Sequence, residues 1–284
     1  MKIAIVGGGF AGTALAYFLQ DEEVSLFEQG TGASHIAAGL LHTRPGKDRR
    51  LSERGEEGMK ATEELLEVAG WPVAEGIIRD GVLVEGYTVF CATYLKRLKE
   101  QIKLSTHQEN FDRVIYCLGY GVQELGYDLP LRFVKGQVLR CRLNIPLPHS
   151  IIGDGYVAIS EQAGECFVGS TYEHNFTSVE KDIQEAKRLI LPRTHTFFPS
   201  ISEEDVIDCA SGVRVVNRHH YRPLVQEVEP GIYVMTAMGS RGLLYHALYA
   251  KELAHEIYLS RHRGLDGHPR RRLPLSGLSV GPSL

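Results

Sequence analysis

Residues 2–12 read Lys2-Ile-Ala-Ile-Val6-Gly7-Gly8-Gly9-Phe10-Ala11-Gly12, an apolar run that passes directly into a glycine-rich turn. The apolar run predicts a buried strand, and the apolar spacing of residues 10–19 predicts a helix that packs back on it. A second apolar run over 24–27 predicts another strand, which ends at Glu28. A strand, a turn, a helix and a strand within so short a stretch form a right-handed βαβ unit, which predicts a parallel sheet.

The glycines follow the dinucleotide-binding pattern Gly7-x-Gly9-x-x-Gly12. In that pattern the first glycine makes the tight turn, the second lets the backbone approach a pyrophosphate, and the third allows the helix to pack on the strand. The helix N-terminus offers unpaired N–H groups to the phosphates. Glu28 stands where a carboxylate accepts from ribose hydroxyls and would repel a 2′-phosphate, which disfavours NADP. NAD and FAD share this pattern, and a glycine turn without any ligand is the alternative.

The rest of the chain predicts a second, smaller sheet inserted into this domain. Helical patterns occupy 52–69, 91–102, 178–191 and 243–258, and strand patterns occupy 77–84, 113–118, 232–238 and much of the chain after 133. We therefore predict an α/β fold, a Rossmann-like domain with an inserted, mainly antiparallel α+β substrate domain. The predicted division is 1–70, 88–132 and 210–263 for the nucleotide-binding domain, 71–87 and 133–209 for the inserted domain, and 264–284 for a flexible tail.

Composition narrows the class of protein. The chain has 284 residues, 43% of them hydrophobic, which argues against disorder and coiled coil. The net charge of −4 excludes a wholly basic nucleic-acid-binding protein. Five cysteines without a C-x-x-C motif predict buried reduced thiols rather than a metal site or disulfides. We expect a cytoplasmic protein with no metal and no membrane partner.

Two further strand–glycine junctions, Cys117-Leu118-Gly119 and 237–242, resemble the first. The helix N-terminus after Gly242 could stabilise a negative group, such as an anionic reduced flavin. An ordinary turn into an amphipathic helix explains the same spacing equally well.

Several stretches occur in the order typical of the D-amino-acid-oxidase-like FAD oxidoreductases: 32–43, 134–138, 169–173, 212–223 and 238–243. Over roughly residues 1–260 the chain most resembles the oxidoreductase half of the bifunctional tRNA 5-methylaminomethyl-2-thiouridine biosynthesis enzyme. The resemblance implies FAD as cofactor and oxidation of a C–N bond beside a carboxylate. That enzyme's methyltransferase half has no match here, so a separate methyltransferase is an expected partner.

The resemblance also implies the site residues. Arg214 and Arg241 take the positions of substrate-facing arginines, and guanidinium groups bind carboxylates in bidentate fashion. Tyr156 and Tyr172 take substrate-facing positions on strands. The alternative for each arginine is a salt bridge, and Arg241 could instead have only its backbone facing the flavin. For each tyrosine the alternative is a place in the core or at an interface.

The cofactor site implied by the resemblance and the glycine motifs extends over much of the sequence. Ser34 would donate to the pyrophosphate, Gly39 and Leu40 would bring backbone to the flavin ring, and His42 is more readily a packing histidine than a base. The full set is Gly7, Gly9, Phe10, Ala11, Gly12, Glu28, Gln29, Ser34, Gly39, Leu40, Leu41, Cys117, Leu118, Gly119, Gly239, Ser240, Arg241, Gly242, Leu243 and Leu244.

The predicted reaction is hydride transfer from a CH2 on a neutral amine to the flavin, followed by hydrolysis of the imine. The closer relative implies carboxymethylaminomethyl-uridine in tRNA as substrate and aminomethyl-uridine as product. Basic clusters at 44–50 and 261–272 could meet tRNA phosphates or simply be solvated. An oxidase of free glycine, sarcosine or a D-amino acid, and a non-catalytic nucleotide-binding protein, are the competing hypotheses.

Overall fold

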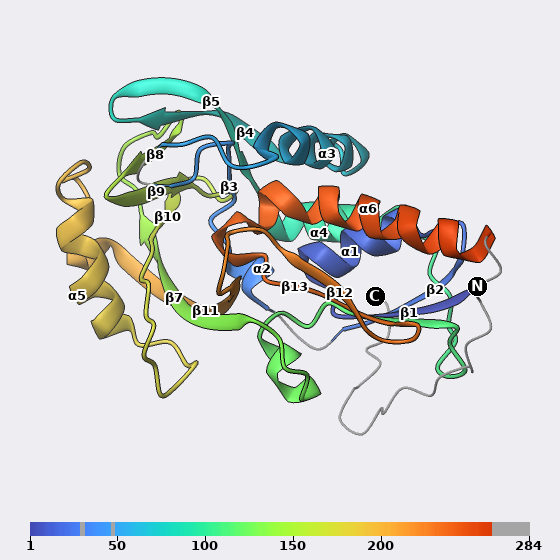
Figure 1. Ribbon diagram of the computed structural model, residues 1–284. Coiled ribbons are helices and arrows are strands. Elements are labelled where there is room, and N and C mark those ends of the chain that lie inside the picture. Colours follow the sequence, from blue (N-terminus) through green and yellow to red (C-terminus); the bar gives the residue numbers. More distant parts are fainter. Residues whose placement is uncertain (29–31, 47–48, 263–284) are drawn as a thin grey trace.

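The computed structural model describes residues 1–28, 32–46 and 49–262, and in them two β-sheets lie side by side with most helices gathered over one (Figure 1). The expected cofactor residue Gln29, the tail 264–284 and the side chains of the basic cluster 261–272 lie outside the described residues. Every helix in the described part of the chain is too short or too polar to span a lipid bilayer.

Sheet A has the strand order β12(Leu224–Glu229), β13(Ile232–Thr236), β6(Arg113–Tyr116), β1(Lys2–Val6) and β2(Glu23–Phe27). Strands β13, β6, β1 and β2 are parallel, and β12 pairs with β13 in the antiparallel sense. Helix α1(Phe10–Phe18) connects β1 to β2, so the predicted βαβ unit is confirmed.

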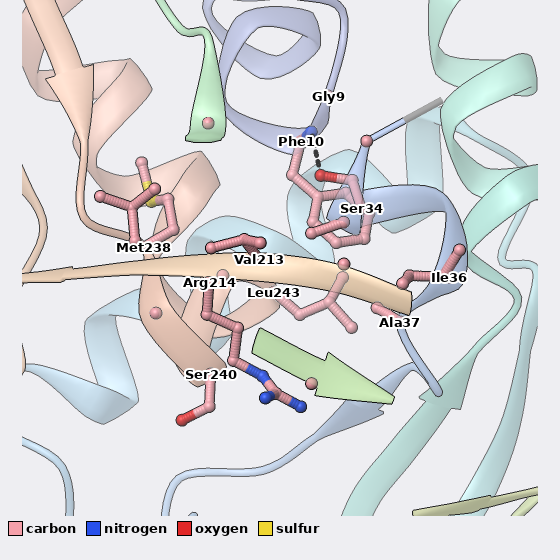
Figure 2. Close-up of a pocket in the computed structure, with 18 of the residues that line it drawn as sticks. Gly9, Phe10, Ser34, Ile36, Ala37, Val213, Arg214, Met238, Ser240 and Leu243 are labelled. Carbon is pink, nitrogen blue, oxygen red and sulfur yellow. Dashed lines mark hydrogen bonds between the residues drawn. The ribbon is translucent and has the colours of Figure 1, made fainter. Parts of the chain in front are cut away.

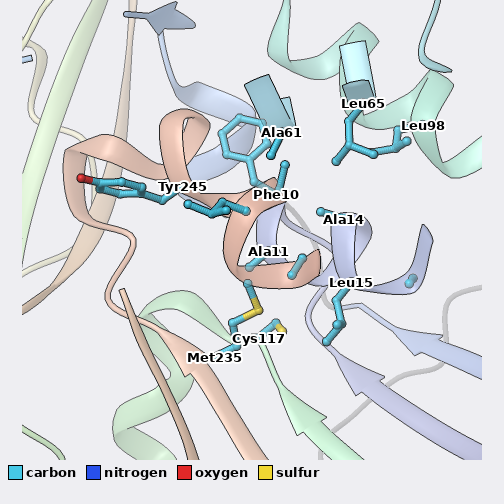
Figure 3. Close-up of a cluster of buried hydrophobic side chains, with 14 of the residues drawn as sticks. Phe10, Ala11, Ala14, Leu15, Ala61, Leu65, Leu98, Cys117, Met235 and Tyr245 are labelled. Atoms are coloured by element: carbon cyan, nitrogen blue, oxygen red, sulfur yellow. The ribbon is translucent and has the colours of Figure 1, made fainter. Parts of the chain in front are cut away.

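Alternating side chains bury both faces of sheet A. Ile3 and Ile5 pack under the helices α1, α3(Gly55–Val68), α4(Cys91–Glu100) and α6(Gly242–His262), in the cluster drawn in Figure 3. Ala4 and Val6 face the other way, into a second cluster that includes Leu131 and Val215 of the other sheet. The run of apolar residues in β1 is continuous because neither of its faces meets water.

Sheet B has the order β11-β7-β10-β9-β8-β4-β5-β3. All its strand pairs are antiparallel except β4 with β8, which confirms the predicted inserted, mainly antiparallel domain. Helix α5(Ile183–Thr194) covers its β7 and β9 strands. The strands are β3(Leu40–Leu41), β4(Val73–Arg79), β5(Val82–Val89), β7(Leu131–Arg142), β8(Ser150–Gly153), β9(Gly155–Ile159), β10(Glu165–Gly169) and β11(Val206–Asn217).

Several observed boundaries differ from the predicted ones. The loop predicted over 31–50 contains a short helix, α2(Ala33–Ile36), and β3, which joins sheet B. Helix α5 begins at Ile183 rather than 178, because the Asp182 side chain accepts from the N–H groups of Gln184 and Glu185 and caps it. The domain boundaries at 132/133 and 209/210 fall inside β7 and β11.

Short 3₁₀ segments, η1(Gly119–Leu125), η2(Glu203–Asp205) and η3(Gly239–Arg241), complete the chain. All five cysteines are buried and free, as predicted, and burial raises the pKa of Cys117 and Cys166 to about 12.

The two sheets meet where Val216 of β11 forms a bridge with Met238, which follows β13. This junction brings the end of sheet A beside the face of sheet B.

Candidate functional site

A cavity of about 1470 Å³ lies where the two sheets meet. Its walls are the turn after β1, helix α2 with the segment after it, the end of β6, the paired strands β7 and β11, and the turn before α6 (Figure 2). Three strand–glycine junctions therefore open into one cavity, although they are far apart in the sequence. This arrangement follows from the parallel order of β13, β6 and β1, because their carboxyl ends lie at the same edge.

The glycine turn has the geometry predicted for Gly7 and Gly12. Gly7 has a positive φ of 117°, and a Cβ there would overlap the carbonyl oxygen of Cys117. A Cβ on Gly12 would overlap the carbonyl oxygen of Gly7, so helix α1 can approach the strand only without a side chain. A Cβ on Gly9 would lie 2.8 Å from Oγ of Ser34. The Phe10 N–H donates to the same oxygen at 3.2 Å, as Figure 2 shows.

Glu28 directly follows β2 and lies next to this turn. Its Oε2 accepts from Nζ of Lys99 on α4 at 2.5 Å, and a Cβ on Gly8 would overlap that carboxylate. Glu28 thus lies against the glycine turn with an exposed side, where a ribose could be bound. Lys99 was not predicted, because it lies 71 positions from Glu28 in the sequence.

Most of the predicted cofactor residues line the cavity. These are Gly7, Gly9, Phe10, Ala11, Ser34, Gly39, Leu40, Cys117, Leu118, Gly119, Gly239, Ser240, Gly242 and Leu243. The remaining described ones lie behind or beside its wall: Gly12, Leu41 and Leu244 are buried, Glu28 contacts the turn, and Arg241 lines a neighbouring pocket.

These residues fit a dinucleotide such as FAD. The glycine turn leaves room for a pyrophosphate at the N-terminus of α1, where Ser34 and the Phe10 N–H already meet. From there the cavity continues past Gly39 and Leu40 to Arg214 and the turn before α6. It is also far larger than a small amino acid alone would need.

Arg214 comes from the strand pair that forms the opposite wall. In the β11–β7 register Gly212 faces Gly136 and Arg214 faces Val134, so the guanidinium lies over a part of the sheet without side chains. Nη1 donates to the carbonyl oxygen of Thr171 at 3.2 Å, and Nη2 donates to Oγ of Ser170 at 2.8 Å. Among the described residues its side-chain partners are Ser170, Thr171 and the Tyr172 ring, and none of them is a carboxylate. A half-buried guanidinium with such partners is suited to bidentate binding of an anion.

The two predicted tyrosines flank Arg214. The Arg214 guanidinium carbon lies 4.6 Å from the centre of the Tyr172 ring, in the geometry of a cation–π contact. Tyr156 lies beside Gly169, and burial raises the pKa of its phenol to about 12, with the charge of Arg214 opposing the shift in part. Tyr156 therefore stays neutral at physiological pH and can act as a hydrogen-bond donor.

Arg241 lies on the outer side of the same wall. Its guanidinium carbon is 4.5 Å from the centre of the Tyr221 ring, and it lines a side pocket of about 300 Å³ rather than the main cavity. Arg214, Tyr172, Met238 and Ser240 line both pockets, so the two are adjacent.

His42 lines the cavity near Arg79. Burial, aided by the charge of Arg79, lowers the pKa of His42 to about 4, so the imidazole is neutral above pH 5. The Arg193 guanidinium, also at the cavity, donates to the Ser170 carbonyl at 3.1 Å and pairs with Asp154 at 3.3 Å.

Ser170, Gly136 and Arg193 were not predicted as site residues. The stretch 169–173 was among those that resemble the oxidoreductase family. The place of Ser170 in the site, however, depends on its hydrogen bond with Arg214, which is 44 positions away in the sequence.

Comparison with known proteins identifies the family. The model of the family described as DAO, FAD dependent oxidoreductase, matches residues 2–84 and 73–256. Glycine oxidase from Bacillus cereus has a similar structure, with a TM-score of 0.71, 17% sequence identity and coverage of 97% of this chain and 99% of that one. Iminodiacetate oxidase from Chelativorans sp. BNC1 is also similar, with a TM-score of 0.70, 15% sequence identity and coverage of 99% of this chain and 100% of that one. No curated protein gives a significant sequence match.

At these identities the solved structures show the fold alone, while the family match extends over most of the chain and both sheets. The predicted fold class, the enzyme class and FAD as the cofactor are thereby confirmed. The chain belongs to the DAO family of FAD-dependent oxidoreductases.

Proposed function

We propose that this enzyme oxidises a secondary amine whose neighbouring carbon carries a carboxylate, and that its substrate is the carboxymethylaminomethyl group of a tRNA wobble uridine. The CH2 beside the carboxylate loses a hydride equivalent, that is two electrons and a proton, and water hydrolyses the resulting protonated imine. The products are glyoxylate and aminomethyl-uridine. FAD supplies the two-electron oxidation when it is bound in the cavity.

The observation that carries the proposal is the uncompensated charge of Arg214. Its hydrogen bonds to Ser170 and Thr171 use two of the five guanidinium N–H donors, which leaves donors for a carboxylate. Tyr172 stacks on the guanidinium and limits its rotation. A carboxylate bound there would hold the amine end of the substrate in the main cavity, and such positioning contributes several kcal/mol to catalysis.

The other polar groups of the cavity support oxidation of an amine that arrives neutral. Tyr156, with its pKa raised to about 12 by burial, can donate a hydrogen bond but is not a base. His42, with its pKa lowered to about 4 by burial, is neutral and can only accept a proton weakly. Since a neutral amine already has its lone pair available, no stronger protein base is required.

The tRNA substrate is supported by the stretches that resemble the tRNA-modifying relative. Basic residues near the cavity offer contacts for a polynucleotide, although Arg49 already pairs with Asp80 at 2.6 Å. The product, a primary amine, would be the substrate of a separate methyltransferase.

A free small amino acid is the second candidate. It is favoured by the match with glycine oxidase, whose length this chain spans almost completely. In this case Arg214 would hold the carboxylate of glycine or sarcosine in the same way.

The test is to incubate the holoenzyme with tRNA that carries carboxymethylaminomethyl-uridine and, separately, with glycine, sarcosine and D-alanine. Loss of the carboxymethyl group with release of glyoxylate, and no turnover of the free amino acids, supports the tRNA substrate. Peroxide formation with glycine or sarcosine alone supports the second candidate. Arg214→Ala should retain FAD and lose turnover of either substrate, while Arg214→Lys should recover only part of it.

A further inference from the structure

A side pocket of about 300 Å³ lies next to the main cavity, and Arg214 lines both. Its polar lining consists of Arg132, Arg214, Arg241, His174, Tyr172, Tyr221 and Ser240. No aspartate or glutamate of the described chain is part of this lining.

Strand register explains why these residues meet. Arg132 of β7 pairs with Val216 of β11, and Val216 forms a bridge with Met238, which precedes Arg241. Since side chains alternate along a strand, Arg132 and Arg214 share a face, and the turn after Met238 adds Arg241 beside them.

Glu173, which stands between the pocket residues Tyr172 and His174 in the sequence, is paired on the other face of the sheet. Glu173 pairs with Lys135 at 3.7 Å and accepts from Oγ1 of Thr171 at 2.5 Å. Lys135 alternates with Val134 and Gly136, so this ion pair lies behind the strands that form the pocket. The positive charge in the side pocket is therefore not balanced by the described part of the protein.

Arg241 is also held in place. Its guanidinium lies 4.5 Å from the centre of the Tyr221 ring, and this ring is 69% exposed. The stacking orders a long side chain at the surface without neutralising it. An ordered, unpaired guanidinium is suited to bidentate recognition of an oxyanion.

We propose that this side pocket binds a second oxyanion of the substrate, a phosphate or a carboxylate attached beyond the oxidised nitrogen. The proposal rests on the proposed function, because Arg214, at the border of the two pockets, then holds the first carboxylate. Arg132 and Arg241 bind the second group, and Tyr172 and Tyr221 form the apolar sides. In a nucleotide substrate this group is a phosphate, and in a free amino diacid it is a carboxylate.

Two matched pairs of compounds test this. One pair is carboxymethylaminomethyl-uridine and its 5′-monophosphate, and the other is N-ethylglycine and N-(2-carboxyethyl)glycine. In one pair we expect kcat/KM to be about tenfold higher for the member with the additional anionic group, as for one charged hydrogen bond. That pair identifies the oxyanion. Arg132→Gln should bring the ratio close to one by lowering kcat/KM for the member with the additional anionic group.

Arg142→Gln is the matched control. Arg142 is an exposed arginine at the far end of the same strand, outside the pocket, so this variant should keep the wild-type ratio. A ratio near one in both pairs for the wild-type enzyme, or a high ratio that persists in Arg132→Gln, overturns the proposal.

Binding of inorganic phosphate to the holoenzyme, measured by calorimetry, separates this proposal from the proposed function. If none of the four compounds is oxidised but phosphate binds and Arg132→Gln abolishes the binding, the side pocket stands and the proposed function fails. If the compounds without the additional anionic group are oxidised and neither phosphate binding nor the ratio depends on Arg132, the side pocket fails and the proposed function stands.

Discussion

Gly136 leaves open the space that the Arg214 guanidinium fills, since a Cβ on Gly136 would lie 2.5 Å from the guanidinium carbon and overlap Nη1. The two residues are on neighbouring strands of sheet B, and Gly136 is buried. The position of the Arg214 guanidinium therefore depends on the absence of a side chain on the adjacent strand.

We expect Gly136→Ala to lower kcat/KM on the order of tenfold to a hundredfold, that is about 1.4–2.8 kcal/mol. The new methyl group meets the far end of a flexible side chain, so the guanidinium moves and the fold is retained. Steady-state kinetics and the thermal midpoint measure the two effects. Full activity in Gly136→Ala would show that Arg214 does not need its observed position.

Glu28→Gln should weaken FAD binding about tenfold, because the carboxylate beside the glycine turn would lose one charged hydrogen bond to the ribose. Lys99→Met should change the Kd for FAD less than fivefold, since Glu28 is 41% exposed and such ion pairs contribute about 0.2–1 kcal/mol. Titration of the apoprotein with FAD, followed by flavin fluorescence, gives both values. Equal losses of FAD affinity in the two variants would mean that the ion pair between Glu28 and Lys99, and not the carboxylate alone, supports FAD binding.

The stability of the fold should fall as the pH is lowered from 6.5 to 4. Burial lowers the pKa of both His42 and His246 to about 4, so the unfolded chain binds more protons than the folded one in this range. Each histidine contributes at most roughly 3 kcal/mol to this loss, and neither contributes above pH 7. Urea unfolding at pH 4.5, 5.5 and 7.5 measures the slope, which should be shallower in His246→Asn. A pH-independent unfolding midpoint would contradict the neutral state of both groups.

Asp182→Ala should lower the free energy of unfolding by about 1 kcal/mol and leave catalysis intact. The Asp182 side chain caps α5, which packs on the side of sheet B formed by Leu139, Cys141 and Val168. Asp182→Asn, which keeps an acceptor oxygen, is the matched control. A drop in kcat that exceeds the loss of folded protein would indicate that α5 also acts on the site.

The features that the sequence predicts well are local. The turn Gly7 to Gly12, its strand and its helix depend on near neighbours, and Arg214 follows an apolar strand pattern that places it on an inner face. The direction of the Arg241 side chain could not be predicted. The glycines on either side of it indicate a turn, but they do not determine which pocket the side chain enters.

The features that escaped prediction depend on pairing between distant segments. Arg132 lines the side pocket only because β7 pairs with β11 in one register, which places it opposite Val216. Lys99 meets Glu28 only because α4 packs against α1. Composition and periodicity carry no information about either contact.

The bridge between Val216 and Met238 has a mechanical consequence. Strand β11 pairs with β7 along its length, and its Val215 packs in the core beneath sheet A. A rotation of sheet A against sheet B would have to break this bridge and expose that core. Substrates and products must therefore enter and leave while the two sheets keep their relative position. We expect the side chains and loops at the cavity entrance to set the rates of exchange.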